Sequence, residues 1–245
     1  MSDKIVTPVI TKLDFRAKEA INALRGNIQM AGYHVKTIAV TSARANEGKS
    51  SLAFQLAKSL AGLQKRTLYL DCDIRNSKVK RRYDIVAKTD GLSQYLCGNA
   101  DAEQIIYHTD DPFFDLIFSG PSAPNPSELL SNELLEQLLN KLKEEYDYVV
   151  VDTPPVNVVI DAALIAPRCD TTLLVIESHF TNRKDALRAK IHLEYSGARI
   201  LGIVLNKFPR NQGIYGKYGY GKYGYGKYGY EKYGYEKDDS GNEDV

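Results

Sequence analysis

The apolar residues of this chain follow two periodicities, which together predict a mixed α/β fold. Several short segments are apolar throughout rather than at every second position, as expected of strands buried on both faces of a parallel sheet. These strands are expected at 36–41, 67–70, 114–118, 148–151, 171–176 and 200–205. Apolar residues at helical spacing predict helices at 14–31, 49–63, 127–145 and 182–195. We therefore expect a three-layer α/β domain with a mainly parallel sheet over residues 35–210, preceded by a helical segment over residues 1–34.

Residues 211–245 differ in composition from the rest of the chain. Tyr-Gly pairs alternate there with Lys or Glu, and no aliphatic residue follows Ile214 until Val245. A segment of this kind buries too little surface to offset its ordering entropy, so we expect a disordered, flexible tail. Its repeat contains Tyr215, Tyr218, Tyr220, Tyr223, Tyr225, Tyr228, Tyr230, Tyr233 and Tyr235.

Charge and cysteine content exclude several classes of function. The net charge of +1 gives no general attraction to nucleic acid, so no nucleic-acid partner is expected. Cys72, Cys97 and Cys169 have no metal-binding or redox spacing and suit a reducing compartment. No apolar run approaches the roughly 18 residues that span a bilayer, and the N-terminus lacks the pattern of a signal peptide. We expect a cytoplasmic protein that reaches a membrane only through a partner.

The segment from Ser42 to Ser51 has the pattern of a phosphate-binding loop between a strand and a helix. It ends in Gly48-Lys49-Ser50, although Ala43 stands where the first glycine is usual. Backbone amides would face the phosphates, Lys49 would reach the β- and γ-phosphates, and the Ser50 hydroxyl would hold Mg²⁺. This pattern predicts a P-loop NTPase domain that binds MgATP. The other candidate nucleotide-binding residues of the loop are Ser42, Asn46, Glu47 and Ser51.

Three aspartates follow apolar strands and strengthen this prediction. Asp71 and Asp73 end the second strand, and Asp152 ends the fourth. Ligands of open α/β sheets bind at the carboxyl ends of the strands, and Mg²⁺ requires oxygen ligands there. Each acid alone could instead cap a helix, but three beside one phosphate loop favour a metal site formed by Asp71, Asp152 and Ser50. Asn206, at the end of the last strand, is a candidate for reading the adenine edge or for forming a turn.

With Arg75, these residues form Asp71-x-Asp73-x-Arg75 after an apolar strand. Together with the phosphate loop, residues 149–155 and the tyrosine cluster, the chain resembles the bacterial tyrosine kinases (BY-kinases) of capsule and exopolysaccharide synthesis. The resemblance covers the whole chain and is to the form with a separate membrane activator. It implies ATP- and Mg²⁺-dependent autophosphorylation, with the nine repeat tyrosines as acceptors. A flexible tail of about 25 residues spans roughly 25–30 Å, whereas the domain is about 35–40 Å across, so we expect transfer in trans to a neighbouring copy.

The resemblance also implies partners and a location. It implies a membrane-embedded activator of the polysaccharide co-polymerase type, a ring of identical subunits and a protein-tyrosine phosphatase. The chain would then lie at the inner face of the cell membrane through its activator. The family's Glu-x-x-Arg-x-x-Arg oligomerisation pattern is replaced here by Glu19, Asn22 and Arg25, which share one helix face. The missing arginine weakens the expected interface, and an ordinary solvated helix face is the alternative.

The expected reaction is transfer of a phosphoryl group to a phenol, which depends mainly on positioning and charge. Lys49 would neutralise charge on the γ-phosphate, while Ser50 and Asp152 would orient Mg²⁺. Asp71 and Asp73 would share metal contact and activation of the phenol. Because a phenol has a pKa near 10, a carboxylate must accept its proton, and we favour Asp71 as that base.

Two other functions are compatible with parts of the sequence. One is a ParA/MinD-like switch ATPase, but the signature lysine of that class is replaced by Arg44, and hydrolysis requires no clustered phenols. The other is an aromatic, cationic tail that binds an acidic polymer or RNA, which the acidic residues near the end of the chain oppose. The basic run 78–82 is interpreted as a solvated helix face, or alternatively as a surface for anionic headgroups.

Overall fold

The computed structural model describes residues 5–9, 12–85 and 89–209 and contains one sheet. Its strand order is β3-β4-β2-β5-β1-β6-β7, and every neighbouring pair is parallel except β3 with β4. The strands are β1 Thr37–Ser42, β2 Thr67–Asp71, β3 Ile106–His108, β4 Phe114–Ile117, β5 Tyr148–Asp152, β6 Thr171–Glu177 and β7 Ile200–Asn206.

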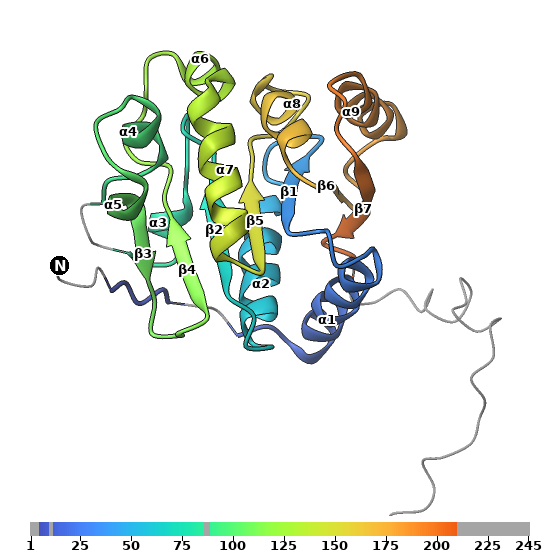
Figure 1. Cartoon of the computed structure of the whole chain (residues 1–245). Helices are drawn as coiled ribbons and strands as arrows, with labels where there is room; N and C mark the ends of the chain where they lie inside the picture. The colour runs from blue at the N-terminus through green and yellow to red at the C-terminus, as the bar shows by residue number, and fades with distance from the viewer. Residues whose placement is uncertain (1–4, 10–11, 86–88, 210–245) are drawn as a thin grey trace, which may run out of the picture. The chain divides into compact units, whose positions relative to one another are not determined.

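Helices cover both faces of this sheet (Figure 1). They are α1 Phe15–Met30, α2 Lys49–Ala61, α3 Val79–Arg82, α4 Leu92–Leu96, α5 Ala102–Ile105, α6 Pro126–Ser131, α7 Glu133–Glu145, α8 Asp161–Ile165 and α9 Arg183–Tyr195, with a 3₁₀ turn η1 at Ala166–Arg168. One core cluster packs α1, α2 and α3 against one face of the sheet, and a second packs α4 to α9 against the other. The predicted three-layer P-loop α/β fold with a mainly parallel sheet is confirmed.

Burial explains why the central strands could be predicted. Every residue of β1, β2 and β4 is buried, so these strands carry no polar alternation. Within β1, Ile38 packs into the α2 side of the core and Ala39 into the opposite side. At the sheet edge, β7 pairs only with β6 among the described strands, and its side chains Ile203 and Leu205 are exposed.

The structure differs from the predicted elements in two places. The helix predicted at 127–145 is interrupted at Asn132, which adopts an extended backbone and caps α7 by accepting a hydrogen bond from the Leu134 amide at 3.3 Å. The short antiparallel strand β3 and the helices α3, α4, α5 and α8 were not predicted. The expected tail, 211–245, and its nine tyrosines lie outside the described residues, as does the end of the predicted domain at 210.

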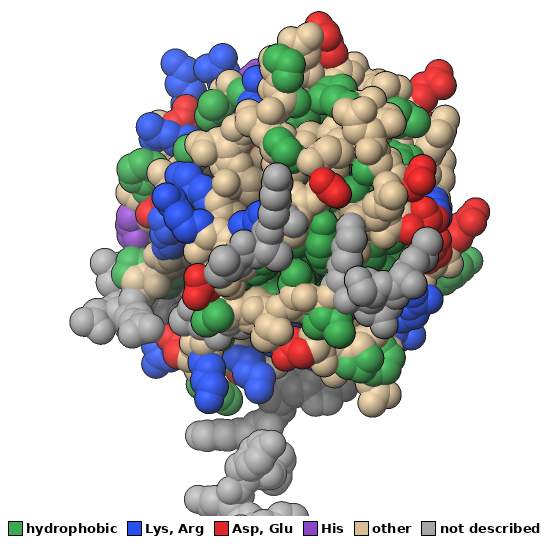
Figure 2. All heavy atoms as spheres, turned by 90° about the vertical axis from the view of Figure 1, so that its left-hand side faces the viewer, with side chains coloured by type: hydrophobic (Ala, Val, Ile, Leu, Met, Phe, Trp, Pro, Cys, Tyr) green, Lys and Arg blue, Asp and Glu red, His purple; other side chains and the backbone are tan. Residues whose placement is uncertain are grey.

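Charged side chains are unevenly spread over the surface of the described chain. In Figure 2, Lys and Arg side chains are more numerous toward the left of the view, and Asp and Glu side chains toward the right. None of the helices in the described ranges is long and apolar enough to span a bilayer.

Candidate functional site

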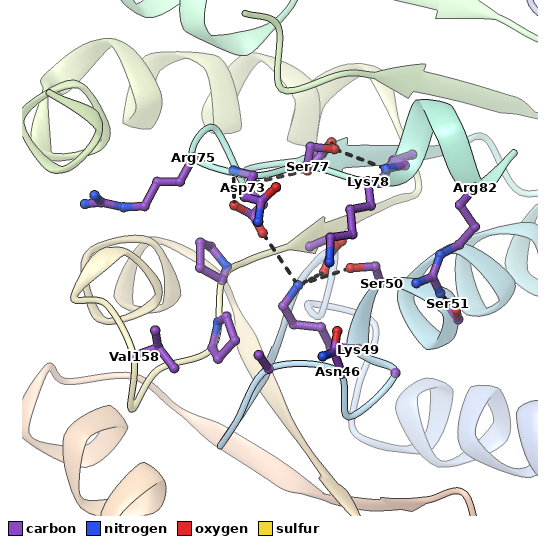
Figure 3. A pocket seen from close by; sticks show the side chains of 18 of the residues that line it. Asn46, Lys49, Ser50, Ser51, Asp73, Arg75, Ser77, Lys78, Arg82 and Val158 are labelled. Carbon is purple, nitrogen blue, oxygen red and sulfur yellow. Dashed lines mark hydrogen bonds and ion pairs between the residues drawn. The ribbon is translucent and has the colours of Figure 1, made fainter. Parts of the chain in front are cut away.

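A cavity of about 570 Å³ opens at the carboxyl edge of the sheet (Figure 3). The loop after β1, the loops after β2 and β5, and the end of β7 all contribute to its lining. Within it, Asp71 and Asp152 are direct register partners on the neighbouring strands β2 and β5. The predicted convergence of these acids at the edge of the sheet therefore arises from strand pairing.

The phosphate loop is shaped by Gly48 and by contacts from β7. Gly48 has φ +88°, and a Cβ there would lie 2.2 Å from Nδ2 of Asn206. That Asn206 amide donates to the Glu47 carbonyl at 2.8 Å, and Lys207 Nζ donates to the Asn46 carbonyl at 2.7 Å. No side chain caps the start of α2 at Gly48, so its first amides are available to an anion.

Two predicted nucleotide-binding side chains point away from the cavity. The fully buried Glu47 carboxylate accepts hydrogen bonds from the Arg44 amide at 2.7 Å and from the Thr181 hydroxyl. The Ser42 hydroxyl donates to the Arg44 carbonyl at 2.7 Å. These side chains hold the loop together, and neither residue lines the cavity. The loop residues Asn46, Gly48, Lys49, Ser50 and Ser51 do line the cavity.

Lys49 lies at the centre of the predicted catalytic residues. Its Nζ is 3.9 Å from Oδ2 of Asp73 and 3.7 Å from Oδ1 of Asp152, and it donates to the Ser50 hydroxyl at 3.1 Å. Figure 3 shows Lys49, Ser50 and Asp73 directed toward one another. The structure thus brings a cation, a hydroxyl and two carboxylates into one cluster.

Asp152 is buried, and within the described residues only one of its two carboxylate oxygens is hydrogen-bonded. Its Oδ2 accepts a hydrogen bond from the Tyr69 hydroxyl at 2.8 Å, and burial beside this carboxylate raises the pKa of Tyr69 well above its ordinary value. Its Oδ1 is buried and has no hydrogen-bond partner in the described part of the chain. A buried carboxylate oxygen that accepts no hydrogen bond from the described residues and lies 3.7 Å from Lys49 Nζ fits a hard cation such as Mg²⁺.

The carboxylates alone do not form a complete metal site. Within the residues described, no group of three His, Cys, Asp or Glu side chains is arranged to hold an ion. This suits Mg²⁺ bound together with a nucleotide, since that ion commonly takes one or two protein oxygens, phosphate oxygens and water.

Burial and a neighbouring charge strongly perturb Asp71. Desolvation and repulsion from Asp152 raise the pKa of Asp71 from 3.8 to about 7, although hydrogen bonds from the Ser77 hydroxyl and the Asp73 amide partly oppose the shift. A carboxyl group that titrates near neutrality suits general-base catalysis.

Arg75, the last residue of the Asp71-x-Asp73-x-Arg75 motif, fastens the loop after β2 to the opposite wall. Its Nε and Nη2 donate to the fully buried Asp161 of α8 at 2.6 and 2.9 Å, and Nη2 also donates to the Ser127 hydroxyl of α6 at 2.6 Å. No local pattern points to Asp161, which lies 86 residues from Arg75 along the chain.

The predicted oligomer-interface residues lie on α1, away from the cavity. Asn22 donates to Glu19 at 2.9 Å, whereas Arg25 donates to the carbonyl and hydroxyl oxygens of Ser59 on α2, each at 2.9 Å. Arg25 is thus engaged within its own chain, and Glu19 is exposed. Arg44, at the signature-lysine position, lies 3.7 Å from Asp185 of the same chain.

Several known proteins are similar to this chain in sequence and in fold. A family model described as an AAA domain matches residues 35–187. The tyrosine-protein kinase CpsD of Streptococcus agalactiae is 41% identical over 204 residues, which cover 83% of this chain and 89% of that relative. The tyrosine-protein kinase etk of Escherichia coli (strain K12) is 34% identical over 192 residues, or 78% of this chain and 26% of that protein. The solved kinase domain of ETK has a TM-score of 0.77 and 33% identity, covering 80% of this chain and 77% of that chain.

A more distant structural likeness concerns the switch-ATPase alternative. The septum site-determining protein MinD of Pyrococcus horikoshii OT3, complexed with Mg-ADP, has a TM-score of 0.63 at 20% identity. The match covers 73% of this chain and 72% of that chain. At this identity the likeness shows the fold alone, so the ParA/MinD-like alternative has only distant structural support.

Proposed function

The chain belongs to the bacterial tyrosine-kinase family and is a protein-tyrosine kinase, and we propose that it phosphorylates its own C-terminal tyrosines in trans. The donor is ATP, and the acceptors are the nine tyrosines from Tyr215 to Tyr235 of a second copy. One observation carries the proposed chemistry: Asp71 and Asp152 are register partners at the ends of neighbouring strands, and Lys49 Nζ lies 3.7 Å from Asp152 Oδ1.

In the proposed step, the phenol oxygen forms a bond to the γ-phosphorus as the bond to the β,γ-bridging oxygen breaks. The phenol proton passes to the ionised carboxylate of Asp71, and ADP leaves. Lys49 compensates the charge on the transferring group, and the amides at the start of α2 hold the other phosphates. Asp73, whose Oδ2 lies 3.9 Å from Lys49 Nζ, would orient the incoming phenol.

Mg²⁺ fits the same residues. Ser50, Asp152 through water, and Asp71 would hold the ion, which supplies positive charge to the phosphate oxygens. Asn206 lies at the β7 end of the cavity, where its remaining oxygen is available to a nucleobase while its amide holds the phosphate loop.

The proposed cellular role is regulation of capsular or exopolysaccharide synthesis. We place the chain in the cytoplasm, at the inner face of the membrane, where it is held by a membrane-embedded activator of the polysaccharide co-polymerase type. The matched segment makes up 26% of the longer etk protein of Escherichia coli. A ring of copies and a protein-tyrosine phosphatase complete the proposed cycle.

Transfer between copies is tested by mixing two full-length chains. The acceptor copy carries Lys49→Met, and the kinase copy has its nine tail tyrosines replaced by Phe. Phosphate on the Lys49→Met copy establishes transfer in trans. Absence of phosphate there, while the unaltered chain alone labels its own tyrosines, would show transfer within one chain. A kinase copy that also carries Lys49→Met is the control.

A further inference from the structure

The cations that line the cavity fall into two groups. Lys49, Arg75 and Lys207 each pair with a carboxylate, at distances of 3.7, 2.6 and 2.9 Å respectively. Lys78 and Arg82 also line the cavity, yet no carboxylate among the described residues lies within ion-pair distance of either. Lys78 and Arg82, here called the basic rim, therefore present uncompensated positive charge at the mouth of the site.

The basic rim is held on a firm support. Between its two residues, the buried side chain of Val79 anchors α3, and the adjacent Tyr83 stacks on Phe54 of α2 with ring centroids 3.8 Å apart. The Arg82 guanidinium donates to the hydroxyl of Ser51 in the first turn of α2. Figure 3 shows Lys78 and Arg82 extending from this helix toward the phosphate loop. Their charge is thus fixed beside the reacting groups.

The basic rim lies on the acceptor side of the site. The sheet order β2-β5-β1-β6-β7 places Asn206, the candidate for nucleobase contact, at one end of the cavity. The basic rim lies at the other end, where β2 ends at Asp71 and the following loop carries Asp73. A tyrosine that approaches Asp71 therefore brings its flanking residues past Lys78 and Arg82. The buried Val79 of α3 belongs to the same core cluster as the buried residues of α2.

We propose that the basic rim binds acidic residues that flank the acceptor tyrosine, so that the kinase selects tyrosines in acidic peptides. The inference rests on the proposed kinase function and names its acceptor specificity. This chain contains such a peptide: residues 229–245 carry six acidic residues and two lysines, a net charge of −4. Residues 209–228 carry four basic residues and no acid, a net charge of +4.

The proposal predicts an order of phosphorylation. Tyr233 and Tyr235, which are followed by Glu236, Asp238 and Asp239, are phosphorylated before Tyr215 and Tyr218, which are flanked by lysine. Each phosphate adds about −1.5 to −2 charges, so a modified tyrosine becomes an acidic flank for its neighbour. Phosphorylation therefore spreads from the acidic end toward the basic end of the cluster.

The test follows single tyrosines in the two-copy assay. An isotope-labelled Lys49→Met chain is the acceptor, and mass spectrometry measures the initial rate at each tyrosine. The kinase copy is unaltered, or carries Lys78→Glu with Arg82→Glu, or carries Arg81→Glu as the matched control. Arg81 is on the same helix as Arg82 and undergoes the same Arg-to-Glu substitution, but it does not line the cavity. The acceptor is also prepared with Asp238, Asp239, Glu243 and Asp244 replaced by their amides.

We expect the double variant to slow phosphorylation of Tyr233 and Tyr235 at least about fivefold through a higher acceptor KM. The Arg81→Glu control changes this rate less than twofold, and amide replacement in the acceptor reproduces the loss with unaltered kinase. The effect weakens as salt rises, because the contact is at the surface. An unchanged order and rate in the double variant would overturn the proposal.

Three further outcomes would also overturn it. An equal rise in the KM for ATP would assign Lys78 and Arg82 to the nucleotide, and an equal loss in Arg81→Glu would remove the role of the rim. Loss of binding to anionic lipid vesicles with unchanged acceptor kinetics would assign the charge to a membrane surface. If the unaltered chain phosphorylates no tyrosine at all, the proposed function fails rather than this inference alone.

Discussion

The perturbed titration of Asp71 makes the apoprotein less stable as the pH rises. The folded-state pKa of Asp71 is raised from 3.8 to about 7, so between these values the folded chain holds a proton that the unfolded chain has lost. By linkage, the stabilising contribution is fully present below about pH 3.8 and is lost as the pH rises through 7. Replacing Asp71 with Asn removes this titration while keeping a carbonyl oxygen to accept the Ser77 hydrogen bond.

The expected magnitude follows from the size of the shift. Each pKa unit corresponds to about 1.36 kcal/mol, so the full shift is worth about 4 kcal/mol. From pH 5 to pH 8 the unfolding free energy of the unaltered chain should fall by about 2.5 kcal/mol relative to Asp71→Asn. No discount for solvent screening is needed, because Asp71 is 1% exposed.

The assay is urea unfolding of the full chain in EDTA at several pH values. Asp73→Asn is the matched control, since it removes a neighbouring carboxylate that is only partly buried, and it should retain the slope. MgADP should flatten the slope of the unaltered chain, because a bound cation favours the ionised carboxylate. Parallel pH profiles for the unaltered chain and Asp71→Asn would refute the reasoning.

Three other substitutions test separate contacts. Lys49→Met should lower phosphate transfer at least about a hundredfold, as measured by tyrosine labelling, because it removes the charge beside the reacting phosphate; near-normal transfer would exclude that role. Arg75→Ala should lower the free energy of unfolding by about 2 kcal/mol, as measured by urea unfolding. This is less than the loss expected for a fully buried ion pair, because the Arg75 side chain is 34% exposed. Asp161→Asn added to it should recover part of that loss, and no recovery would mean that the buried charge is not the cause. Gly48→Ala should weaken binding of a fluorescent ATP analogue at least about tenfold, because alanine is strained at φ +88° and its Cβ would clash with Asn206. Unchanged binding would contradict the loop geometry.

The sequence predicted the centre of the fold well because burial leaves a clear pattern there. The six strands expected from apolar runs all occur. Five of them lie in the interior of the sheet, and the sixth, β7, forms one edge. By contrast, β3 spans Ile106–His108 and buries only Tyr107, which is too short a pattern to recognise. Asn132 suits an exposed helix position as well as a cap, so only the tertiary fold reveals the break.

The candidate site was predictable where its residues end strands and was not where contacts are long-range. Asp71, Asp152 and Lys49 converge as expected from the parallel topology. The partner of Arg75 and the bond from Thr181 to Glu47 depend on how distant loops fold over the sheet, and no local spacing encodes them.

The central claim is that the phosphoryl group of ATP goes to tyrosine rather than to water. The most direct measurement is incorporation from γ-labelled ATP with Mg²⁺, followed by mass mapping, with Lys49→Met as the control. Label confined to Tyr215–Tyr235, and absent in Lys49→Met, is the predicted result. Release of free phosphate at saturating ATP with no label on any tyrosine would contradict the claim and favour a switch ATPase.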